Sequence, residues 1–399
     1  MRTSRIVVPC LVGSACLSLA LLACGSSSSG APPLAEPGAD SGAPVIDAAG
    51  PTVDAAGEAG DAGALSPACT TRLAALQKGV DGAHGAATNA VLSLRDPTCG
   101  DMFVSSGPGK VTASELHRIG SVTKTYVAAV ILGLVNEGKL SLDADFLSTW
   151  VTTIPNGSTI TIRQLLSHTS GVFNYTDDTT FESEVTMDPT KVWAPSELVA
   201  VAARNTPYFA PGQGWTYSNT DYILLGIIAE AVTSGKIGAL VRQDVLTKVG
   251  LNATFFAGEE PVQGTLALGL STTGANETNF ADPSYAWAAG AIVATPGDVA
   301  LWIERVGSGA FYDAKTQAEL VTPAAMSDQD GFAYGLGVFL IDPSVTGGAG
   351  PGIGHSGDIP GYHTQAFYFP NEKTTIVSIC DSDADDPNNL TAVALEVLF

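Results

Sequence analysis

The sequence predicts an α+β fold in which an antiparallel sheet is built from both ends of the chain and flanked by helices, with a helical lobe inserted between the two ends. Two strand patterns around a turn occur early, at 88–96 and 100–107. Strand patterns return only late in the chain, at 334–342, 363–370 and 374–380. Because the segments between them have helical periods, we expect the early and late strands to share one sheet.

The helices of this fold are predicted by apolar periodicity. An amphipathic helix begins near Ala68, and a final helix begins at Asn389. The helix that opens at Ser121 is apolar on all sides from Tyr126 onward, which is typical of a helix buried within a large fold. Three further helical periods fill the middle of the chain, at 196–204, 220–234 and 237–249. We therefore assign 67–399 to one folded domain.

Charge and histidine spacing exclude several classes of function. The chain of 399 residues has a formal net charge of -22. Nucleic acids and anionic membrane surfaces bind to clusters of Lys and Arg, so neither is an expected partner of this acidic chain. The five histidines are scattered, with none at the spacing of a metal site. We predict no metal and no cofactor.

The N-terminus has the pattern of an export signal. Arg2 and Arg5 precede an apolar run that ends at Cys24, so 1–23 is predicted to be a signal peptide. The ending "LLAC" resembles a bacterial lipobox, which predicts a lipid anchor on Cys24. The alternative is an ordinary cleaved signal peptide. We expect an exported protein of the bacterial cell envelope, held at the membrane only through this lipid.

A tether and three cysteines follow the predicted anchor. Residues 24–66 contain no Lys, Arg or aromatic residue, which is the composition of a disordered linker. Beyond the linker, three cysteines enter an oxidising compartment, so one pair and one free thiol is the simplest count. We favour Cys69 with Cys99, because Cys380 lies within a strand pattern.

A serine and a lysine occupy the first turn of the apolar helix. Ser121 and Lys124 are three residues apart and therefore lie on one helix face. Lysine is misplaced near the positive end of a helix dipole. Desolvated there, it would lose its proton readily and could accept the proton of the serine. The alternative is that Ser121 only caps the helix.

A second polar cluster precedes the next long helix. In "PGQGWTYSNTDY", Tyr217 and Asn219 are two residues apart, so in an extended segment their side chains point the same way. A phenol and an amide could then converge on one pocket. The alternative is a glycine-rich loop in which Asn219 or Thr220 caps the helix and Tyr217 packs behind it.

A third cluster lies in "GIGHSGDIPGYHT", where His355, Ser356 and Gly357 are expected in a loop ahead of a strand. Glycine permits close approach, so a substrate could pair along that strand. The segment nearly matches the G-x-S-x-G nucleophile elbow, but its fifth residue is Asp358 and a Pro-Gly turn replaces the required helix. This excludes Ser356 as the nucleophile of an α/β-hydrolase.

His168 stands between two serines in "TIRQLLSHTSGV", which invites a Ser-His interpretation. Thr161 and Gln164 form a capping box for a short helix, and the Ser-His-Thr-Ser-Gly segment is the turn that ends it. We therefore interpret His168 as a structural histidine with satisfied hydrogen bonds.

"SVTK", "YSN" and "HSG" in this order resemble the motifs of penicillin-recognising serine hydrolases: class C β-lactamases, D-alanyl-D-alanine carboxypeptidases and related esterases. The resemblance runs from about Ala68 to the C-terminus and implies the β-lactamase/transpeptidase-like fold. It implies that Ser121 forms an acyl-enzyme, that Lys124 and Tyr217 exchange protons with it, and that Asn219 orients Lys124.

The resemblance also assigns roles at the third motif. His355 would polarise Tyr217, and Ser356 and Gly357 would lie along the bound substrate. The N–H groups of Ser121 and Asp358 would form the oxyanion hole. Trp287 would be a wall of the pocket.

The substrate is where this chain departs from the pattern. A carboxypeptidase must hold a free carboxylate, but no cation accompanies the third motif and Asp358 would repel one. We expect a small peptide, β-lactam or ester substrate and a monomeric enzyme, and an esterase or a peptidase for uncharged termini matches Asp358 better than a carboxypeptidase does. The alternatives are a non-catalytic penicillin-binding envelope protein and a purely structural lipoprotein.

Overall fold

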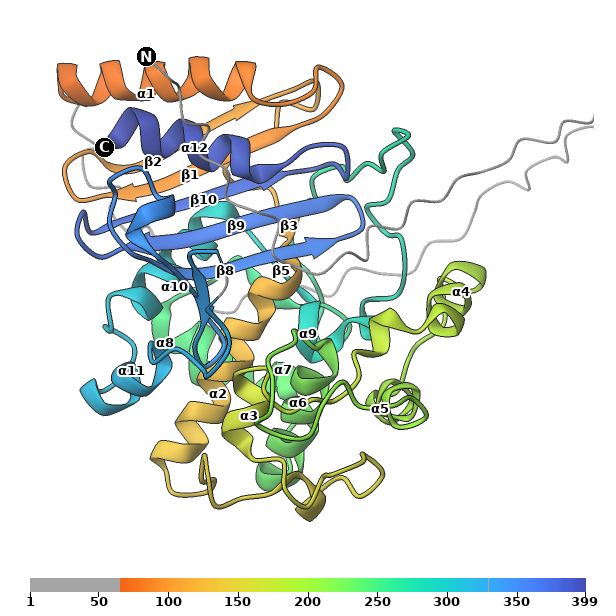
Figure 1. Cartoon of the computed structure of the whole chain (residues 1–399). Helices are drawn as coiled ribbons and strands as arrows, with labels where there is room; N and C mark the ends of the chain where they lie inside the picture. Colours follow the sequence, from red (N-terminus) through yellow and green to blue (C-terminus); the bar gives the residue numbers. More distant parts are fainter. Residues whose placement is uncertain (1–64, 329) are drawn as a thin grey trace, which may run out of the picture. The chain divides into compact units, whose positions relative to one another are not determined.

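The computed structural model describes residues 65–328 and 330–399. Its main sheet has seven strands in the order β2-β1-β10-β9-β8-β7-β6, and every pair is antiparallel. The strands are β1 (Ala90–Asp96), β2 (Gly100–Ser106), β6 (Phe332–Tyr334), β7 (Phe339–Ile341), β8 (Gly352–Ile359), β9 (Tyr362–Phe369) and β10 (Thr374–Cys380). The first strand pairs with the last, as Figure 1 shows, so the predicted sheet from both chain ends is confirmed.

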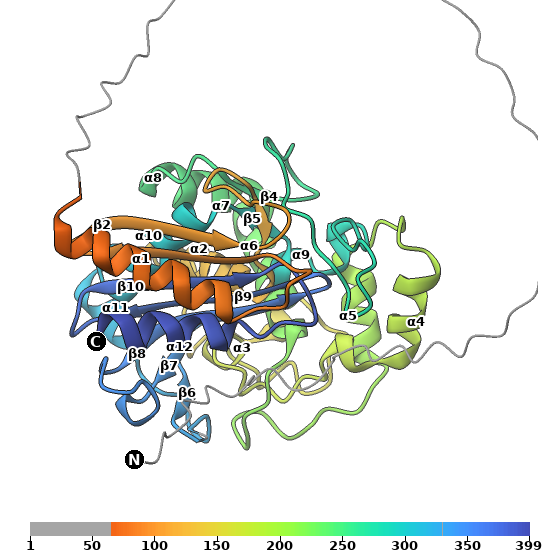
Figure 2. The same ribbon diagram turned by 90° about the horizontal axis from the view of Figure 1, so that it is seen from above.

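Helices cover both faces of this sheet. The terminal helices α1 (Pro67–Gly82) and α12 (Pro387–Leu398) pack against each other on one face, side by side in Figure 2. On the other face, α10 (Pro296–Gly307) packs across β1, β9 and β10. The central strands are therefore buried on both sides, which explains why β10 is apolar without alternation.

The inserted part of the chain is mainly helical. It contains α2 (Thr123–Asn136), α3 (Ile162–Leu166), α4 (Thr179–Met187), α5 (Pro195–Ala203), α6 (Asn219–Thr233), α7 (Ile237–Val241), α8 (Thr247–Val249), α9 (Trp287–Gly290) and α11 (Ala314–Leu320). A small sheet of β3 (His117–Arg118), β5 (Ile292–Ala294) and β4 (Thr254–Phe256) adjoins them. A 3₁₀ turn, Gly120–Val122, leads into α2, whose residues are buried from Thr123 to Leu132, as its all-round apolar pattern predicted.

Two expectations about the late strands need correction. The segment 334–342 does not form one strand, because it divides into the ends of β6 and β7 at a turn containing Gly337, whose φ is +87°. The His355 motif is not a loop ahead of a strand. It lies within β8 itself, because its residues pair with β9 from Ile353 to Ile359. A strand presents alternate side chains to opposite faces, so this difference decides where the motif points.

The predicted disulfide is present between Cys69 and Cys99, and Cys380 is a buried free thiol on β10. The predicted signal peptide, Cys24 and most of the linker lie outside the described residues. Within 65–328 and 330–399, no single helix is long and apolar enough to cross a membrane, and one pair bent by 80°, Asn219–Thr233 with Ile237–Val249, passes by length and composition only. The same residues contain no cluster of three metal-ligating side chains.

Candidate active site

Ser121 and Lys124 meet at the start of α2. Ser121 lies in the 3₁₀ turn, and the Lys124 ammonium, one turn later, donates to its Oγ at 2.9 Å. Lys124 is fully buried, and Ser121 is nearly so. Ser121 does not cap the helix, because no side chain bonds the N-terminal N–H groups there. The capping alternative is therefore wrong.

Lys124 is buried and makes no ion pair with any residue in 65–328 or 330–399. Its Nζ donates to the Asn219 Oδ1 at 2.8 Å and to the carbonyl oxygen of Ala289 at 2.7 Å, in addition to Ser121. Burial holds the pKa of this ammonium well below its usual value, while the charges of Asp221 and Asp358 act against that shift. A lysine of this kind gives up its proton readily and can serve as a base for the serine.

Tyr217 lies on the other side of the lysine. The Lys124 Nζ is 4.9 Å from the centre of the phenol ring, and the buried hydroxyl has no hydrogen-bond partner within the described residues. Burial raises the pKa of the phenol far above its ordinary value, and the Ser121 hydroxyl opposes this shift. Tyr217 therefore keeps its proton at neutral pH and is suited to donate it rather than to accept one.

Asn219, the first residue of α6, is fixed from two sides. Its Oδ1 accepts from Lys124, and its Nδ2 donates to the Thr176 Oγ1 at 3.1 Å. Its backbone N–H donates to the Asn174 Oδ1 at 3.0 Å, and the N-cap of α6 is Ser218. Asn219 is thus an anchor for the lysine, and the expectation that Asn219 or Thr220 only caps the helix is wrong.

The edge of β8 closes the site opposite the serine. A Cβ atom on Gly357 would lie 2.0 Å from the Ile119 carbonyl oxygen and 2.9 Å from the Ser121 nitrogen. A Cβ atom on Gly120 would lie 2.9 Å from the Asp358 nitrogen. The absence of side chains at both glycines therefore lets the Ser121 turn and β8 approach each other closely.

His355 lies close to Tyr217 but does not bond it. The ring centres are 6.3 Å apart, and His355 Nε2 pairs with the Tyr334 hydroxyl at 2.8 Å. Burial, with the charge of Lys124, lowers the pKa of the imidazole to about 3, so the ring is neutral. The expected polarisation of Tyr217 through a direct contact is not present. His355 contributes a neutral aromatic wall behind the phenol.

The sequence model of the Beta-lactamase family matches residues 78–398, which span nearly the whole described chain. This protein belongs to the Beta-lactamase family. Among curated relatives, the putative penicillin-binding protein PbpX of Bacillus subtilis is 24% identical over 261 residues, covering 65% of this chain and 60% of that protein. A putative D-alanyl-D-alanine carboxypeptidase of Escherichia coli O157:H7 is 28% identical over 158 residues, covering 37% of this chain and 36% of that protein. The chain thus spans less than two thirds of the length of each.

Solved structures match over more of their length. A D-stereospecific amidohydrolase from Streptomyces sp. has a TM-score of 0.73 at 28% identity, covering 79% of this chain and 96% of that one. The D-amino acid amidase from Ochrobactrum anthropi SV3, complexed with D-phenylalanine, has a TM-score of 0.73 at 25% identity, covering 82% and 99%. The predicted relationship and the β-lactamase/transpeptidase-like fold are confirmed, and hydrolase chemistry is supported at the level of the family.

In this Beta-lactamase family member, Asp358 leads into a small charged cluster. His363 on β9 bonds the Asp358 Oδ1 at 2.6 Å through Nδ1 and lies 3.3 Å from the Asp383 Oδ1 through Nε2. Burial opposes protonation, but these two carboxylates raise the pKa of His363 to about 10. Burial and the neighbouring Asp383 raise the pKa of Glu277 to about 7. Two carboxylates thus share one imidazolium, so this cluster carries excess negative charge.

The remaining predicted residues occupy two different environments. Ser356 is partly exposed on β8, next to Gly357. Trp287 is not a wall of the pocket, because its indole is buried in the main core and donates to the Glu259 Oε1 at 2.6 Å. It fits against Gly226 of α6, where a Cβ atom would meet the indole at 2.8 Å.

Sequence reasoning missed three contributors. The Ala289 carbonyl, two residues after Trp287, accepts from Lys124, and Asn174 and Thr176 hold Asn219. Any residue type has a backbone carbonyl, so the sequence does not indicate which carbonyl accepts a hydrogen bond from Lys124. The asparagine and threonine occur in an ordinary polar segment, so no sequence pattern could have indicated them.

Proposed function

We propose that this protein is a serine hydrolase that forms an acyl-enzyme on Ser121 from amide or ester substrates of the cell envelope. The observation that carries the proposal is the buried contact of 2.9 Å between the Lys124 Nζ and the Ser121 Oγ. A lysine buried without an ion pair is costly to keep, and proton transfer from the serine gives it a use.

The proposed steps use the lowered pKa of Lys124 and the raised pKa of Tyr217. Neutral Lys124 accepts the Ser121 proton while Oγ attacks the substrate carbonyl carbon. The resulting oxyanion faces the N–H groups of Ser121 and Asp358. When the bond to the leaving group breaks, that group takes the Tyr217 proton, and the proton on Lys124 restores the phenol. Water then attacks the acyl carbon, Ser121 leaves with a proton, and the free enzyme returns.

The charge beside the oxyanion hole favours acyl donors without a free carboxylate next to the scissile bond. Asp358, Asp383 and Glu277 would repel such a group, and His363 is already paired with two of them. Arg118 is a further cation in this part of the fold, but its guanidinium donates to the Thr278 carbonyl and to Asn279. The names of the amidohydrolase and the amidase support testing D-amino acid amides first.

The acyl-enzyme is tested by mass spectrometry of the intact protein. We expect a mass increment on Ser121 after an activated ester or a β-lactam, and none in Ser121→Ala. An increment that persists in the Ser121→Ala protein would overturn the assignment. Steady-state turnover separates the hydrolase from a non-catalytic penicillin-binding protein, which would release one stoichiometric burst and then stop.

A panel of substrates tests the acyl donor. We expect turnover of a D-amino acid amide and a simple ester to exceed that of a D-alanyl-D-alanine peptide, with a chromogenic cephalosporin as a third arm. Asp358→Asn should raise turnover of the D-alanyl-D-alanine peptide and so narrow its difference in turnover from the amide and the ester. If the wild-type enzyme prefers the carboxylate-ended peptide, our interpretation of Asp358 is wrong.

We further propose that the protein is exported as a monomer and anchored by a lipid on Cys24. Labelling of cells with a radioactive fatty acid should mark the wild-type protein and not Cys24→Ser. Release of wild-type protein into the soluble fraction would contradict the anchor.

A further inference from the structure

His168 forms a clamp around Tyr217. It follows α3 in the turn Ser167–Gly171 and has a left-handed backbone, with φ of +59°. Its carbonyl oxygen accepts from the Thr216 N–H at 3.1 Å, and its ring Nδ1 accepts from the Ser218 N–H at 3.3 Å. One histidine therefore holds the residues before and after Tyr217. The two rings also pack together, with their centres 4.3 Å apart.

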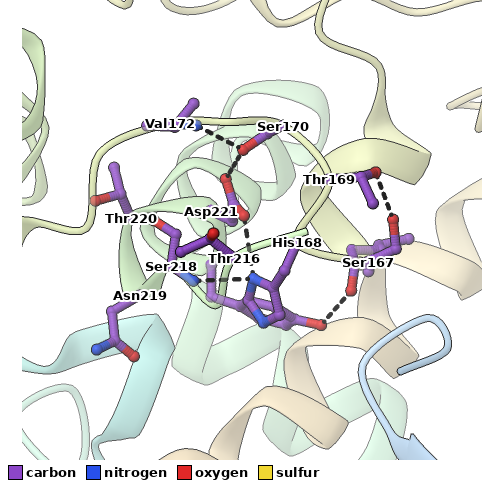
Figure 3. A network of polar contacts seen from close by, with 12 residues as sticks. Ser167, His168, Thr169, Ser170, Val172, Thr216, Ser218, Asn219, Thr220 and Asp221 are labelled. Atoms are coloured by element: carbon purple, nitrogen blue, oxygen red, sulfur yellow. Dashed lines mark hydrogen bonds and ion pairs between the residues drawn. The ribbon is translucent and has the colours of Figure 1, made fainter. Parts of the chain in front are cut away.

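The contact with Asp221 fixes the protonation of this clamp. Figure 3 shows Asp221 between His168 and Ser170. The Ser170 hydroxyl donates to the Asp221 Oδ1 at 2.6 Å, while the Val172 N–H donates to the same hydroxyl oxygen at 3.0 Å. The remaining oxygen, Oδ2, lies 3.1 Å from the His168 Nδ1.

Only one arrangement of protons satisfies every contact. If Nδ1 carried a proton, it would meet the Ser218 N–H head-on, and that hydrogen bond would be lost. With Nδ1 unprotonated, the proton of the 3.1 Å contact between the two groups must sit on the Asp221 Oδ2. Asp221 is then a carboxylic acid, and the His168 ring carries its proton on Nε2. Burial supports this, since it raises the pKa of Asp221 and lowers the pKa of His168.

We propose that His168 positions Tyr217 for proton transfer, and that it does so as a neutral imidazole whose Nδ1 accepts from both the Ser218 N–H and the Asp221 carboxylic acid. The role in catalysis rests on the function proposed above. The Tyr217 hydroxyl has no hydrogen-bond partner of its own within the described residues, so its direction depends on its backbone and on ring contacts. Holding both neighbouring N–H groups limits the phenol to one approach to Ser121.

Other titratable groups surround the clamp and must be considered with it. The charge of Lys124 acts on both His168 and Asp221, and His355 acts on His168. The rings of Tyr222 and Tyr334 lie 5.4 Å and 4.8 Å from the imidazole centre, and His168 Nε2 has no hydrogen-bond partner in the described part of the chain. A neutral Nε2–H against aromatic faces is tolerable, whereas a buried imidazolium would bear the full cost of leaving water.

The tautomer is measured on the wild-type chain by ¹⁵N NMR with labelled histidine, and His168 is assigned by the signal that changes in Asp221→Asn. We expect the Nε2–H tautomer without titration from pH 5.5 to 8.5. An Nδ1–H tautomer or an imidazolium would overturn the proposal. This readout needs no substrate, so it remains decisive if the wild-type enzyme forms no acyl-enzyme and the proposed function itself fails.

The positioning role is tested by three variants. Asp221→Asn keeps a donor for Nδ1 and an acceptor for Ser170, so we expect the pH profile of kcat to keep its wild-type shape, as it should if the Asp221 carboxyl is not ionised. His168→Phe keeps the ring and removes the acceptor, and we expect kcat to fall about 100-fold with KM within threefold. Retained kcat in His168→Phe, or a shifted pH profile in Asp221→Asn, would contradict the clamp.

A matched control is available in a second buried histidine-carboxyl pair, in which His117 Nδ1 contacts the Asp381 Oδ1 at 2.7 Å. His117→Phe should lower Tm as His168→Phe does and leave kcat per folded molecule unchanged. An equal loss of kcat in the two phenylalanine variants would show that His168 has only a structural role. If His168→Phe does not fold, Asp221→Asn and the tautomer still decide the question.

Discussion

The Lys124 ammonium reaches the Ser121 hydroxyl from one helical turn away and is fully buried without a carboxylate in hydrogen-bond contact. Its three partners are a hydroxyl, an amide oxygen and a backbone carbonyl oxygen. Neutral partners do not offset the cost of burying a full charge, so the site favours the neutral amine. The buried Lys124 therefore affects both the stability of the fold and the proposed proton transfer from Ser121.

Lys124→Met should lower the catalytic activity and raise the thermal stability of the protein. Removing the base is expected to lower kcat by at least about 1,000-fold. Methionine has a similar length and is apolar, so Tm should rise because an amine no longer has to be held away from water. Ester turnover and thermal unfolding of the same preparation measure both effects. A variant that unfolds at lower temperature would show that the three hydrogen bonds of Lys124 outweigh its desolvation.

Gly357→Ala should damage the oxyanion hole. A Cβ atom there would lie 2.0 Å from the Ile119 carbonyl oxygen, so β8 must move away from Ser121. We expect kcat to fall about 100-fold or more, as for loss of an oxyanion donor. Gly133→Ala on α2, where nothing lies within 4 Å, is the control and should stabilise by about 0.5–1 kcal/mol. Equal activity in the two variants would exclude this strand edge from catalysis.

Reducing the disulfide should cost stability and spare activity. Cys69 and Cys99 are 30 residues apart, and closing a loop of this length is worth about 3–4 kcal/mol in the unfolded chain. The bond joins α1 to the β1–β2 turn, and neither cysteine bonds a catalytic residue in the described part of the chain. Urea unfolding of Cys69→Ser/Cys99→Ser against wild type measures the loss, and kcat at 25 °C should not change.

The His363 cluster should make stability depend on pH. The pKa of this imidazole is raised in the folded state to about 10, so its contribution is complete below the unfolded pKa of about 6.5. That contribution is lost as the pH rises through about 10, and it is on the order of 5 kcal/mol, at about 1.4 kcal/mol for each pKa unit. Unfolding free energies at pH 6, 8 and 10 should fall more steeply in wild type than in His363→Gln. His84→Gln, at a histidine without a hydrogen-bonded carboxylate, is the control, and parallel curves for all three proteins would refute the cluster.

Some parts of the fold were predictable because their patterns are local. The all-round apolar helix after Ser121, the capping box at Thr161 and the disulfide each depend on residues close in sequence or on a simple count. β8 was missed because glycines and a histidine do not form an alternating pattern. Its strand conformation comes from pairing with β9, which is a tertiary effect.

The sequence by itself determined which chemical groups this protein carries and the order in which the three motifs follow one another. Only the tertiary structure decided how these groups lie relative to one another. His355 bonds Tyr334, and Trp287 lies in the core. His168, which we interpreted as a structural residue with satisfied hydrogen bonds, instead holds both sides of Tyr217, and its Nε2 has no hydrogen-bond partner in the described residues. The physical reason is the distance along the chain over which each feature is determined. Helix faces and caps are set by neighbours within a turn, whereas a proton position depends on burial and on partners that only folding brings within 3 Å.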